Sequence, residues 1–417
     1  MFQNRGDTVD RKLRIVIILF FIFLFGFISF VLVSEHLNME KLKGDYPDLS
    51  EDVYRYRKDI LRIWAIKLLL QFILPLFFLT SRLSYRIRYF VENDRSLFST
   101  GLFYGLIFFT LMFLIKLPLN YYSSFHLSHK YGLSNQTLLR WFEVTVKSFF
   151  INDLILSLFI FIPFYFIYRS PKIWWLQLSF LIIPVIIFMV FISPFIIDPI
   201  FNKYTSIEDE RLGQQITELL HKANIHDAKI YKVDKSKDTK TMNAYMTGIL
   251  HSKRIVLWDT TIDNLEESEV LSITAHEIGH YVEGHIWKSI VFSSIGTILM
   301  MFLIFITSSW ILDLSDGGFG IRKLYDIAAV PLLILVLNFY TFLGSPVTNY
   351  VSRRMEIEAD TYEIVLAEDR EAAVSAMEKL YKQSLGIPRP SKIFRLWYHT
   401  HPTLEERIDF YRNYPIN

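Results

Sequence analysis

The chain has 417 residues, of which 52% are hydrophobic, with 37 Phe and a mean hydropathy of +0.29. This composition excludes an ordinary soluble protein and indicates that a membrane covers much of the apolar surface. With 44 Lys and Arg against 42 Asp and Glu the net charge is only +2, which predicts no nucleic-acid partner, and the absence of Cys excludes disulfides and thiolate metal ligands.

Seven apolar runs are long enough to cross roughly 30 Å of hydrocarbon as helices. In chain order they cover residues 13–33, 62–80, 98–119, 148–168, 173–195, 287–312 and 328–346. The first run follows Arg5, Arg11, Lys12 and Arg14, as a signal peptide would, but it ends without a small-x-small cleavage site. We therefore interpret it as a retained membrane span.

Two of these runs carry polar side chains at membrane depth. Lys67 and Gln71 lie in the second run, and Asn152 and Asp153 lie in the fourth. Polar groups at this depth are costly unless they face protein or water, so these helices are expected to line an interior. Hydrogen bonds between helices, without any interior space, are the alternative.

Polar sequence is confined to a central insert, residues 199–286, and to a tail after the seventh run. In the insert a charged helix is expected over 208–223, followed by strands at 229–233, 241–247 and 254–258, with Gly248 and Ser252 marking a turn. In the tail a helix is expected over 350–384, stopped by Gly386 and Pro388. Two spans separate insert from tail, so both should face one compartment.

The insert contains His276-Glu277-Ile278-Gly279-His280. In a helix, residues i and i+4 share a face, so His276 and His280 can bind one metal ion with Glu277 beside it. Two unrelated surface or core histidines are the alternative. A catalytic zinc needs three protein ligands and one open position, so a third ligand must be found elsewhere.

Among the acidic and histidine residues nearby, Glu283 and His285 lie too far along a continuing helix to reach the same ion. A better candidate is Glu356, which follows the seventh run and lies on the same side of the membrane. Asp360 falls four residues later on the same face, where its carboxylate can accept a hydrogen bond from a ligating histidine. One helix would then supply both groups.

The spacing leaves two alternatives open for this acidic segment. Glu358 is placed as well as Glu356 to be the ligand. Glu356, Glu358 and Glu363 can also form a solvated helical face that pairs with Arg353 and Arg354.

The histidine motif with Gly284 and His285 behind it, together with residues 352–360, resembles the integral-membrane CAAX prenyl proteases and their heat-shock-protein X relatives. Residues 118–125, 130–132, 198–204, 243–245, 253–260 and 401–407 resemble the CAAX branch as well, so the likeness covers nearly the whole chain. The resemblance implies a predominantly α fold in which seven transmembrane helices enclose a chamber beside a small α+β zinc protease domain of the gluzincin type.

The resemblance also implies the roles of the metal-site residues. One zinc ion per chain would be held by His276, His280 and Glu356, with Glu277 as general base and Asp360 orienting a histidine. The expected division is a membrane domain over 1–198, a first catalytic part over 199–286, two spans over 287–346 and a second catalytic part over 347–417.

Four further residues match family positions near the cleft. Asn243 and Ala244 match an edge strand that holds extended substrate, and an ordinary sheet position is the alternative. His401 and Arg407 match groups that stabilise the oxyanion or grip a substrate carboxylate. In the alternative, Arg407 lies in a tail helix and pairs with an acidic neighbour, Glu406 or Glu358.

These residues together predict a zinc metalloendopeptidase that acts on membrane-associated or prenylated C-terminal peptides, with peptide or protein substrates and the lipid bilayer as its partners. Since the motif and Glu356 both adjoin membrane spans, the zinc should lie at the membrane surface. A general quality-control protease and a non-catalytic zinc-bearing transporter or scaffold are the alternatives.

The connection at 313–327 is short, whereas eukaryotic members of the branch tend to carry a long insertion there, and the final Tyr-Pro-Ile-Asn has no dilysine retrieval signal. Both observations favour a bacterial cytoplasmic membrane over the endoplasmic reticulum. The basic loop at 34–61 favours a cytoplasmic catalytic side, although the N-terminus and residues 81–97 are basic too.

Overall fold

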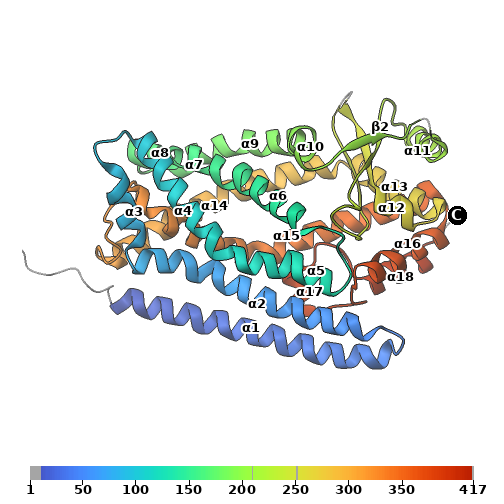
Figure 1. The fold of residues 1–417 in the computed structure, drawn as a ribbon, viewed down its shortest axis with the longest axis horizontal. Helices are drawn as coiled ribbons and strands as arrows, with labels where there is room; N and C mark the ends of the chain where they lie inside the picture. The colour runs from blue at the N-terminus through green and yellow to red at the C-terminus, as the bar shows by residue number, and fades with distance from the viewer. Residues whose placement is uncertain (1–10, 209, 250–251, 416–417) are drawn as a thin grey trace, which may run out of the picture.

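The structure, a computed structural model, describes residues 11–208, 210–249 and 252–415. Long helices lie side by side along the longest axis, and the sheet with several short helices gathers at one end of this bundle (Figure 1). The bundle consists of α1 (Arg11–Asp45), α2 (Glu51–Thr80), α3 (Leu83–Glu92), α4 (Leu97–Asn120), η1 (Tyr121–His126), α5 (Leu127–Lys130), α6 (Leu138–Phe149), η2 (Phe150–Leu154), α7 (Ile155–Phe159), α8 (Phe161–Arg169), α9 (Trp174–Ile196), α10 (Asp198–Phe201), α14 (His285–Ser315), η4 (Ile327–Ala329) and α15 (Val330–Ala367). The remaining elements are β1 (Tyr204–Ser206), α11 (Arg211–Lys222), β2 (Lys229–Val233), β3 (Ala244–Thr247), β4 (Arg254–Trp258), α12 (Asp259–Asn264), α13 (Glu267–Val282), α16 (Arg370–Gln383), α17 (Lys392–Tyr398) and α18 (Leu404–Asn413).

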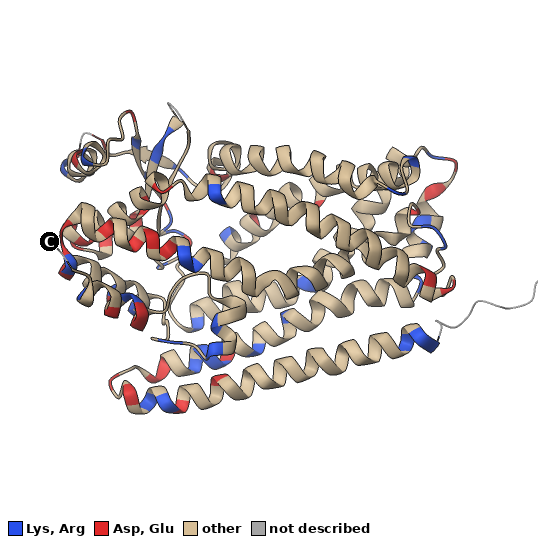
Figure 2. Cartoon of the chain, turned by 180° about the vertical axis from the view of Figure 1, so that it is seen from behind, with Lys and Arg blue, Asp and Glu red and all other residues tan. Residues whose placement is uncertain are grey.

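Seven helical segments among the described residues are long and apolar enough to cross a membrane, which confirms the predicted number. They are Arg11–Asp45, Glu51–Thr80, Leu97–Lys130, Leu138–Arg169, Trp174–Phe201, His285–Ser315 and Ile327–Ala367. Lys, Arg, Asp and Glu gather at the two ends of the bundle, and the long middle section carries few of them (Figure 2). The chain is therefore a multi-pass membrane protein.

The helices continue beyond the apolar runs because polar contacts support their ends. In α1, Glu35 is fully buried and lies 2.8 Å from Arg57 of α2, and its other oxygen accepts the backbone N–H of Ser391 at 2.7 Å. A buried carboxylate is stable only with such partners. This ion pair joins the first two helices to the C-terminal segment.

The polar side chains expected to line an interior do line cavities inside the bundle. Lys67 and Gln71 border a cavity of about 410 Å³. Lys67, Asn152 and Asp153 border a second cavity of about 470 Å³. The predicted interior is confirmed, and the alternative of helix contacts without interior space is wrong for these residues.

The sheet has the strand order β1-β2-β4-β3, so β3 is an edge strand that pairs only with β4. β2 and β4 coincide with the predicted strands and are parallel, whereas β3 and β4 are antiparallel. The prediction missed β1, and it began β3 three residues early. Gly248 makes the turn after β3 with φ +97°, and a Cβ there would lie 2.1 Å from the carbonyl oxygen of Ser252.

The predicted tail helix over 350–384 is wrong in two respects. Its first half is continuous with the seventh span, because α15 runs without interruption from Val330 to Ala367. The helix then breaks at Glu368, which has φ +55°, and α16 restarts behind Asp369, whose side chain accepts the backbone N–H of Ala372 at 2.9 Å. One rigid helix therefore connects the membrane to the polar domain.

Candidate metal site

The histidine motif lies on α13, which packs against α15 and the edge strand β3. A capping box starts the helix: the side chain of Glu266 accepts the backbone N–H of Glu269, and the side chain of Glu269 accepts the backbone N–H of Glu266. Gly279 lets α13 approach α15 closely, since a Cβ there would lie 2.9 Å from the Cβ of Tyr362 and 3.1 Å from the carbonyl oxygen of Ala359. This glycine brings the histidines within reach of α15.

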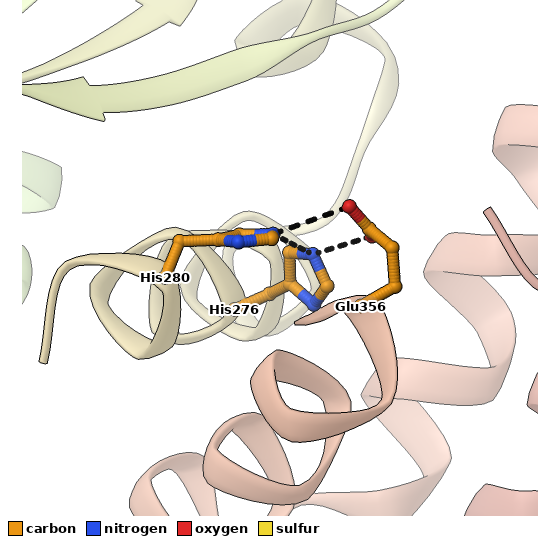
Figure 3. A group of neighbouring side chains, drawn as sticks. All are labelled: His276, His280 and Glu356. Carbon is orange, nitrogen blue, oxygen red and sulfur yellow. Dashed lines mark hydrogen bonds and ion pairs between the residues drawn. The ribbon is translucent and has the colours of Figure 1, made fainter. Parts of the chain in front are cut away.

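Three side chains from the two helices converge on one point (Figure 3). The Nε2 atoms of His276 and His280 are 3.1 Å apart, and they lie 3.4 Å and 3.5 Å from the two carboxylate oxygens of Glu356. Zinc bonds of about 2.0–2.1 Å in a tetrahedron place ligand atoms about 3.3 Å apart. The spacing of the three groups therefore fits a tetrahedral metal ion.

The chemistry of these groups fits a metal as well. Glu356 Oε2 is buried and has no hydrogen-bond partner among the described residues, which is costly unless a cation accompanies it. Burial lowers the pKa of His280 to about 3, so its imidazole is neutral, as a metal ligand must be. Burial also opposes charge on His276, but the neighbouring carboxylates of Asp360 and Glu356 raise its pKa well above the usual value. The site thus stabilises positive charge at its centre.

Behind His276 lies a closed set of buried polar groups. His276 Nδ1 is 2.9 Å from Asp360 Oδ1, and both oxygens of Asp360 accept hydrogen bonds from Arg407, with Nε at 3.0 Å from Oδ2. Arg407 also donates to the hydroxyl of Tyr411 at 3.0 Å, and this hydroxyl donates to Glu363 at 2.6 Å. Because Asp360 fixes the Nδ1–H tautomer, it leaves Nε2 free for a metal.

His276, Asp360 and Glu363 also lie close enough to one another to hold an ion. Arg407 and Tyr411 already occupy the carboxylates of this second group. A guanidinium in this position excludes a second cation, so the arrangement fits one metal ion.

Behind His280 lies a different connection, which sequence reasoning missed. The helix ends at Val282, and Gly284, with φ +66°, turns the chain so that His285 returns to His280 with their Nδ1 atoms 2.8 Å apart. His285 Nε2 lies 3.0 Å from Glu358, which also accepts from Lys288 at 2.7 Å. The expectation of a continuing helix hid this contact, and the glycine was the signal that could have revealed it.

The structure separates the alternatives left open for the acidic segment. Glu356 faces the two histidines, whereas Glu358 faces His285. Glu356 and Glu363 are 6% and 0% exposed, so a solvated acidic face is wrong for both. Arg353 donates instead to the backbone carbonyls of Arg395 and His399.

A cavity of about 490 Å³ opens beside the three converging side chains. Glu277 is half-buried in its wall, and burial raises the pKa of this carboxyl to about 7, although His276 opposes the shift. A carboxyl group with a pKa near 7 can both take and return a proton at neutral pH. Apolar side chains from α9 and α14, including Ile186, Val190 and Ile290, line the other side of this cavity.

Asn243, Ala244 and His401 also line this cavity. His401 Nε2 lies 3.4 Å from Glu356, and its side chain is 57% exposed. The side-chain oxygen of Asn243 accepts the backbone N–H of Ala244 at 2.9 Å, and the backbone of Asn243 bonds to Thr261 and Trp258. The free edge of β3 therefore faces the cavity.

Arg407 lies buried against Asp360, whereas the sequence predicted a position at the cleft. It is 7% exposed, does not line the cavity, and its partner is Asp360 rather than Glu406 or Glu358. Burial alone would lower its pKa, but Asp360 and the neighbouring groups raise the pKa well above the usual value. Arg407 is thus a charged support for Asp360.

Comparison with protein families gives two matches along the chain. Residues 206–414 match the model of peptidase family M48, and residues 46–203 match that of the CAAX prenyl protease N-terminal domain, described as five membrane helices. Together they cover the membrane half and the metal site.

Similar proteins include the uncharacterized metalloprotease YhfN of Bacillus subtilis, 36% identical over 295 residues, which are 71% of this chain and 69% of the relative. CAAX prenyl protease 1 of Saccharomyces cerevisiae is 30% identical over 316 residues, which are 71% of this chain and 68% of the relative. The crystal structure of S. mikatae Ste24p superposes with a TM-score of 0.83 at 23% identity, covering 96% of this chain and 99% of that one. The helical arrangement around an interior is therefore shared with that fold.

Proposed function

Since the chain belongs to peptidase family M48 and is a metallopeptidase, we propose that it is a zinc endopeptidase of the membrane that cleaves membrane-associated or prenylated C-terminal peptides. The observation that carries the proposal is the convergence of His276, His280 and Glu356 at the wall of a cavity that also exposes Glu277. The peptidase family makes a transporter or scaffold without catalysis the less favoured assignment.

His276, His280 and Glu356 would hold one divalent metal, and the nitrogen and carboxylate donors suit zinc. When bound there, zinc supplies a Lewis acid that activates water and polarises the scissile carbonyl. Glu277 takes the proton of the attacking water and returns it to the leaving amine. Burial raises the pKa of Glu277, which favours its taking up a proton.

The remaining residues position these groups and the substrate. Asp360, held by Arg407, orients His276 so that Nε2 faces the metal. His401 lies at the cavity close to Glu356, where it can donate a hydrogen bond to the developing oxyanion. We assign Arg407 to positioning rather than to substrate contact.

An extended substrate would add a strand to the free edge of β3. Ala244 and Met246 of this edge line the cavity, and the N–H of Ala244 donates to the side-chain oxygen of Asn243. A substrate carbonyl would replace that side-chain oxygen on the Ala244 N–H. Without substrate, the side-chain oxygen of Asn243 occupies this hydrogen-bonding position of the edge strand.

The test is the cleavage of matched peptides by the purified protein. We expect a farnesylated CAAX peptide to be cut at least tenfold more efficiently than its unprenylated form, and Glu277→Gln to lose about 10²–10⁴-fold in turnover while keeping one zinc per chain. Equal cleavage of both peptides would favour general quality-control proteolysis. Wild-type turnover by zinc-loaded Glu277→Gln would remove Glu277 from the mechanism.

We further propose that the catalytic end faces the cytoplasm of a bacterial cell. The Lys and Arg residues of 34–61, in the adjoining ends of α1 and α2, lie at that end, where Arg389 of the tail contacts Asp45, and basic segments beside membrane spans favour the cytoplasm. Because the chain has no Cys, Lys222→Cys and Asp94→Cys report the two ends separately. Labelling of intact cells by an impermeant maleimide should reach Asp94→Cys only.

A further inference from the structure

The cavity of about 470 Å³ in the membrane half is bordered by two unusual backbone segments. The π-helical turn η1 contributes Ser123 and Ser124, and the π-helical turn η2 contributes Asn152 and Asp153. π-helical turns are rare, and they are frequently found at functional sites. Two of them lining one cavity indicate a binding site rather than a gap in the packing.

Lys67 projects into this cavity and into the neighbouring cavity of about 410 Å³. Within the part of the chain that the structure describes, its ammonium group forms no ion pair or hydrogen bond. The side-chain amides of Asn120 and Asn152, which line the same cavity, likewise have no hydrogen-bond partner there. Three donor groups that bond to none of the described residues therefore border one space, and all three side chains are exposed, so a ligand can reach them.

The charges around this space suit a ligand with a single negative charge. Asp153 is the acidic residue among those that line the cavity, and it interacts with Lys116. Lys67 has no such counter-charge. The cavity thus offers one ammonium without a counter-charge, that of Lys67, near the carboxylate of Asp153. This arrangement disfavours a phosphate ligand, because its charge is higher. It favours a carboxylate ligand, which one ammonium and two amides can bind.

Lys67 lies inside the apolar run of α2 over residues 62–80. At 1.5 Å per residue, Lys67 lies about 24 Å from the Glu51 end of α2 and about 20 Å from the Thr80 end. Tyr398 borders the cavity of about 410 Å³ and His401, three residues later, borders the zinc cavity, so the two cavities lie near each other.

We propose that the space between η1 and η2 binds the C-terminal carboxylate of a short peptide, held by Lys67 with Asn120 and Asn152. The inference rests on the proposed function, since endopeptidase activity near a chain end delivers such peptides into the chamber. The site would hold the cleaved fragment, or the free end of a substrate, away from the metal.

The test measures direct binding of an N-acetylated aliphatic tripeptide, as free acid and as C-terminal amide, to full-length zinc-loaded protein in nanodiscs. Glu277→Gln in every sample prevents turnover. Because a charge-assisted hydrogen bond contributes about tenfold in affinity, we expect the acid to bind about tenfold tighter than the amide. Lys67→Met should weaken acid binding to the level of the amide, and Lys67→Arg should keep the preference.

Lys58→Met is the matched control, because Lys58 lies on the same helix outside this cavity and its loss should leave the preference unchanged. The proposal is overturned if the Lys67→Met protein still binds the free acid more tightly than the amide. It is also overturned if the protein with Lys67 intact binds the acid and the amide equally. Competition with octanoate tests whether a fatty acid is the source of the carboxylate. If octanoate binds more tightly than the peptide does, the proposal is also overturned. Cleavage of the farnesylated peptide by protein with Glu277 intact reports the proposed function independently.

Discussion

Gly279→Ala tests whether the close approach of α13 and α15 builds the metal site. The new Cβ would lie 2.9 Å from the Cβ of Tyr362 and 3.1 Å from the carbonyl oxygen of Ala359, neither of which is the flexible end of a side chain. Ordinary contact begins near 3.4 Å, so the helices must separate by about 0.5 Å, the difference between 3.4 Å and 2.9 Å. Metal–ligand distances tolerate only about 0.2 Å, so Glu356 should leave the coordination distance of the histidines.

Two opposing effects on stability also follow from Gly279→Ala. Overpacking costs about 1–3 kcal/mol, and the helix propensity of Ala returns up to about 1 kcal/mol. The net loss in unfolding free energy is therefore about 0–3 kcal/mol. Zinc affinity should fall about 10–100-fold, as for other changes that displace ligands indirectly.

The assay is zinc affinity by chelator competition, with activity measured against free zinc. Gly296→Ala on α14 is the matched control, because nothing lies within 4 Å of a Cβ at that position. It should bind zinc normally and unfold no more easily than the unchanged protein. If Gly279→Ala binds zinc as tightly as Gly296→Ala does, the close approach of the two helices has no part in forming the site.

Three further changes test the groups behind the histidines. His285→Phe removes the partner of His280 Nδ1, so zinc should bind about 10–100-fold more weakly and the visible spectrum of the cobalt-substituted protein should shift, whereas unchanged affinity would show that His280 needs no orienting contact. Glu358→Gln should have a smaller effect in the same zinc titration, because Glu358 is 41% exposed and acts only through His285; an effect equal to that of His285→Phe would contradict this order. Arg407→Met leaves Asp360 buried without its ion pair and should lower the unfolding free energy by about 3–5 kcal/mol in denaturant titrations, and a loss under about 1 kcal/mol would mean that Asp360 is already neutral.

Much of the fold followed from properties that depend on local sequence. The seven spans were predictable because the cost of placing polar groups in hydrocarbon forces long apolar runs, and β2 and β4 were predictable because β-branched runs end at turn residues. The break at Glu368 was not predictable, since no Gly or Pro marks the residue that takes the left-handed conformation there. β1 has three residues, too few for a pattern.

The metal site divides in the same way. The i, i+4 spacing placed His276 and His280 on one face, but spacing could not choose between Glu356 and Glu358, because both follow the same span. Their difference lies in the rotation of α15 about its axis, which is fixed by contacts such as that of Ala359 with Gly279. Arg407 was misplaced because its distance from Asp360 depends on how α18 packs on α15 and α16.

The continuity of α15 has a consequence for the substrates that can be cut. Glu356 follows Val330 in the same unbroken helix, so about 39 Å of helix separates them at 1.5 Å per residue. Hydrocarbon takes up roughly 30 Å, and a tilt of about 20° shortens the projection of the helix by only a few ångströms. Glu356 therefore lies within several ångströms of the membrane boundary.

Because the α13–α14 turn at Gly284 fixes the histidines at the start of another span, the metal cannot move away from this boundary without unfolding one of two membrane helices. A soluble protein loop would have to approach the bilayer surface closely to reach this site. A peptide anchored in the membrane by a lipid group already lies at that height. The geometry thus favours substrates whose scissile bond is held near the membrane before it meets the enzyme.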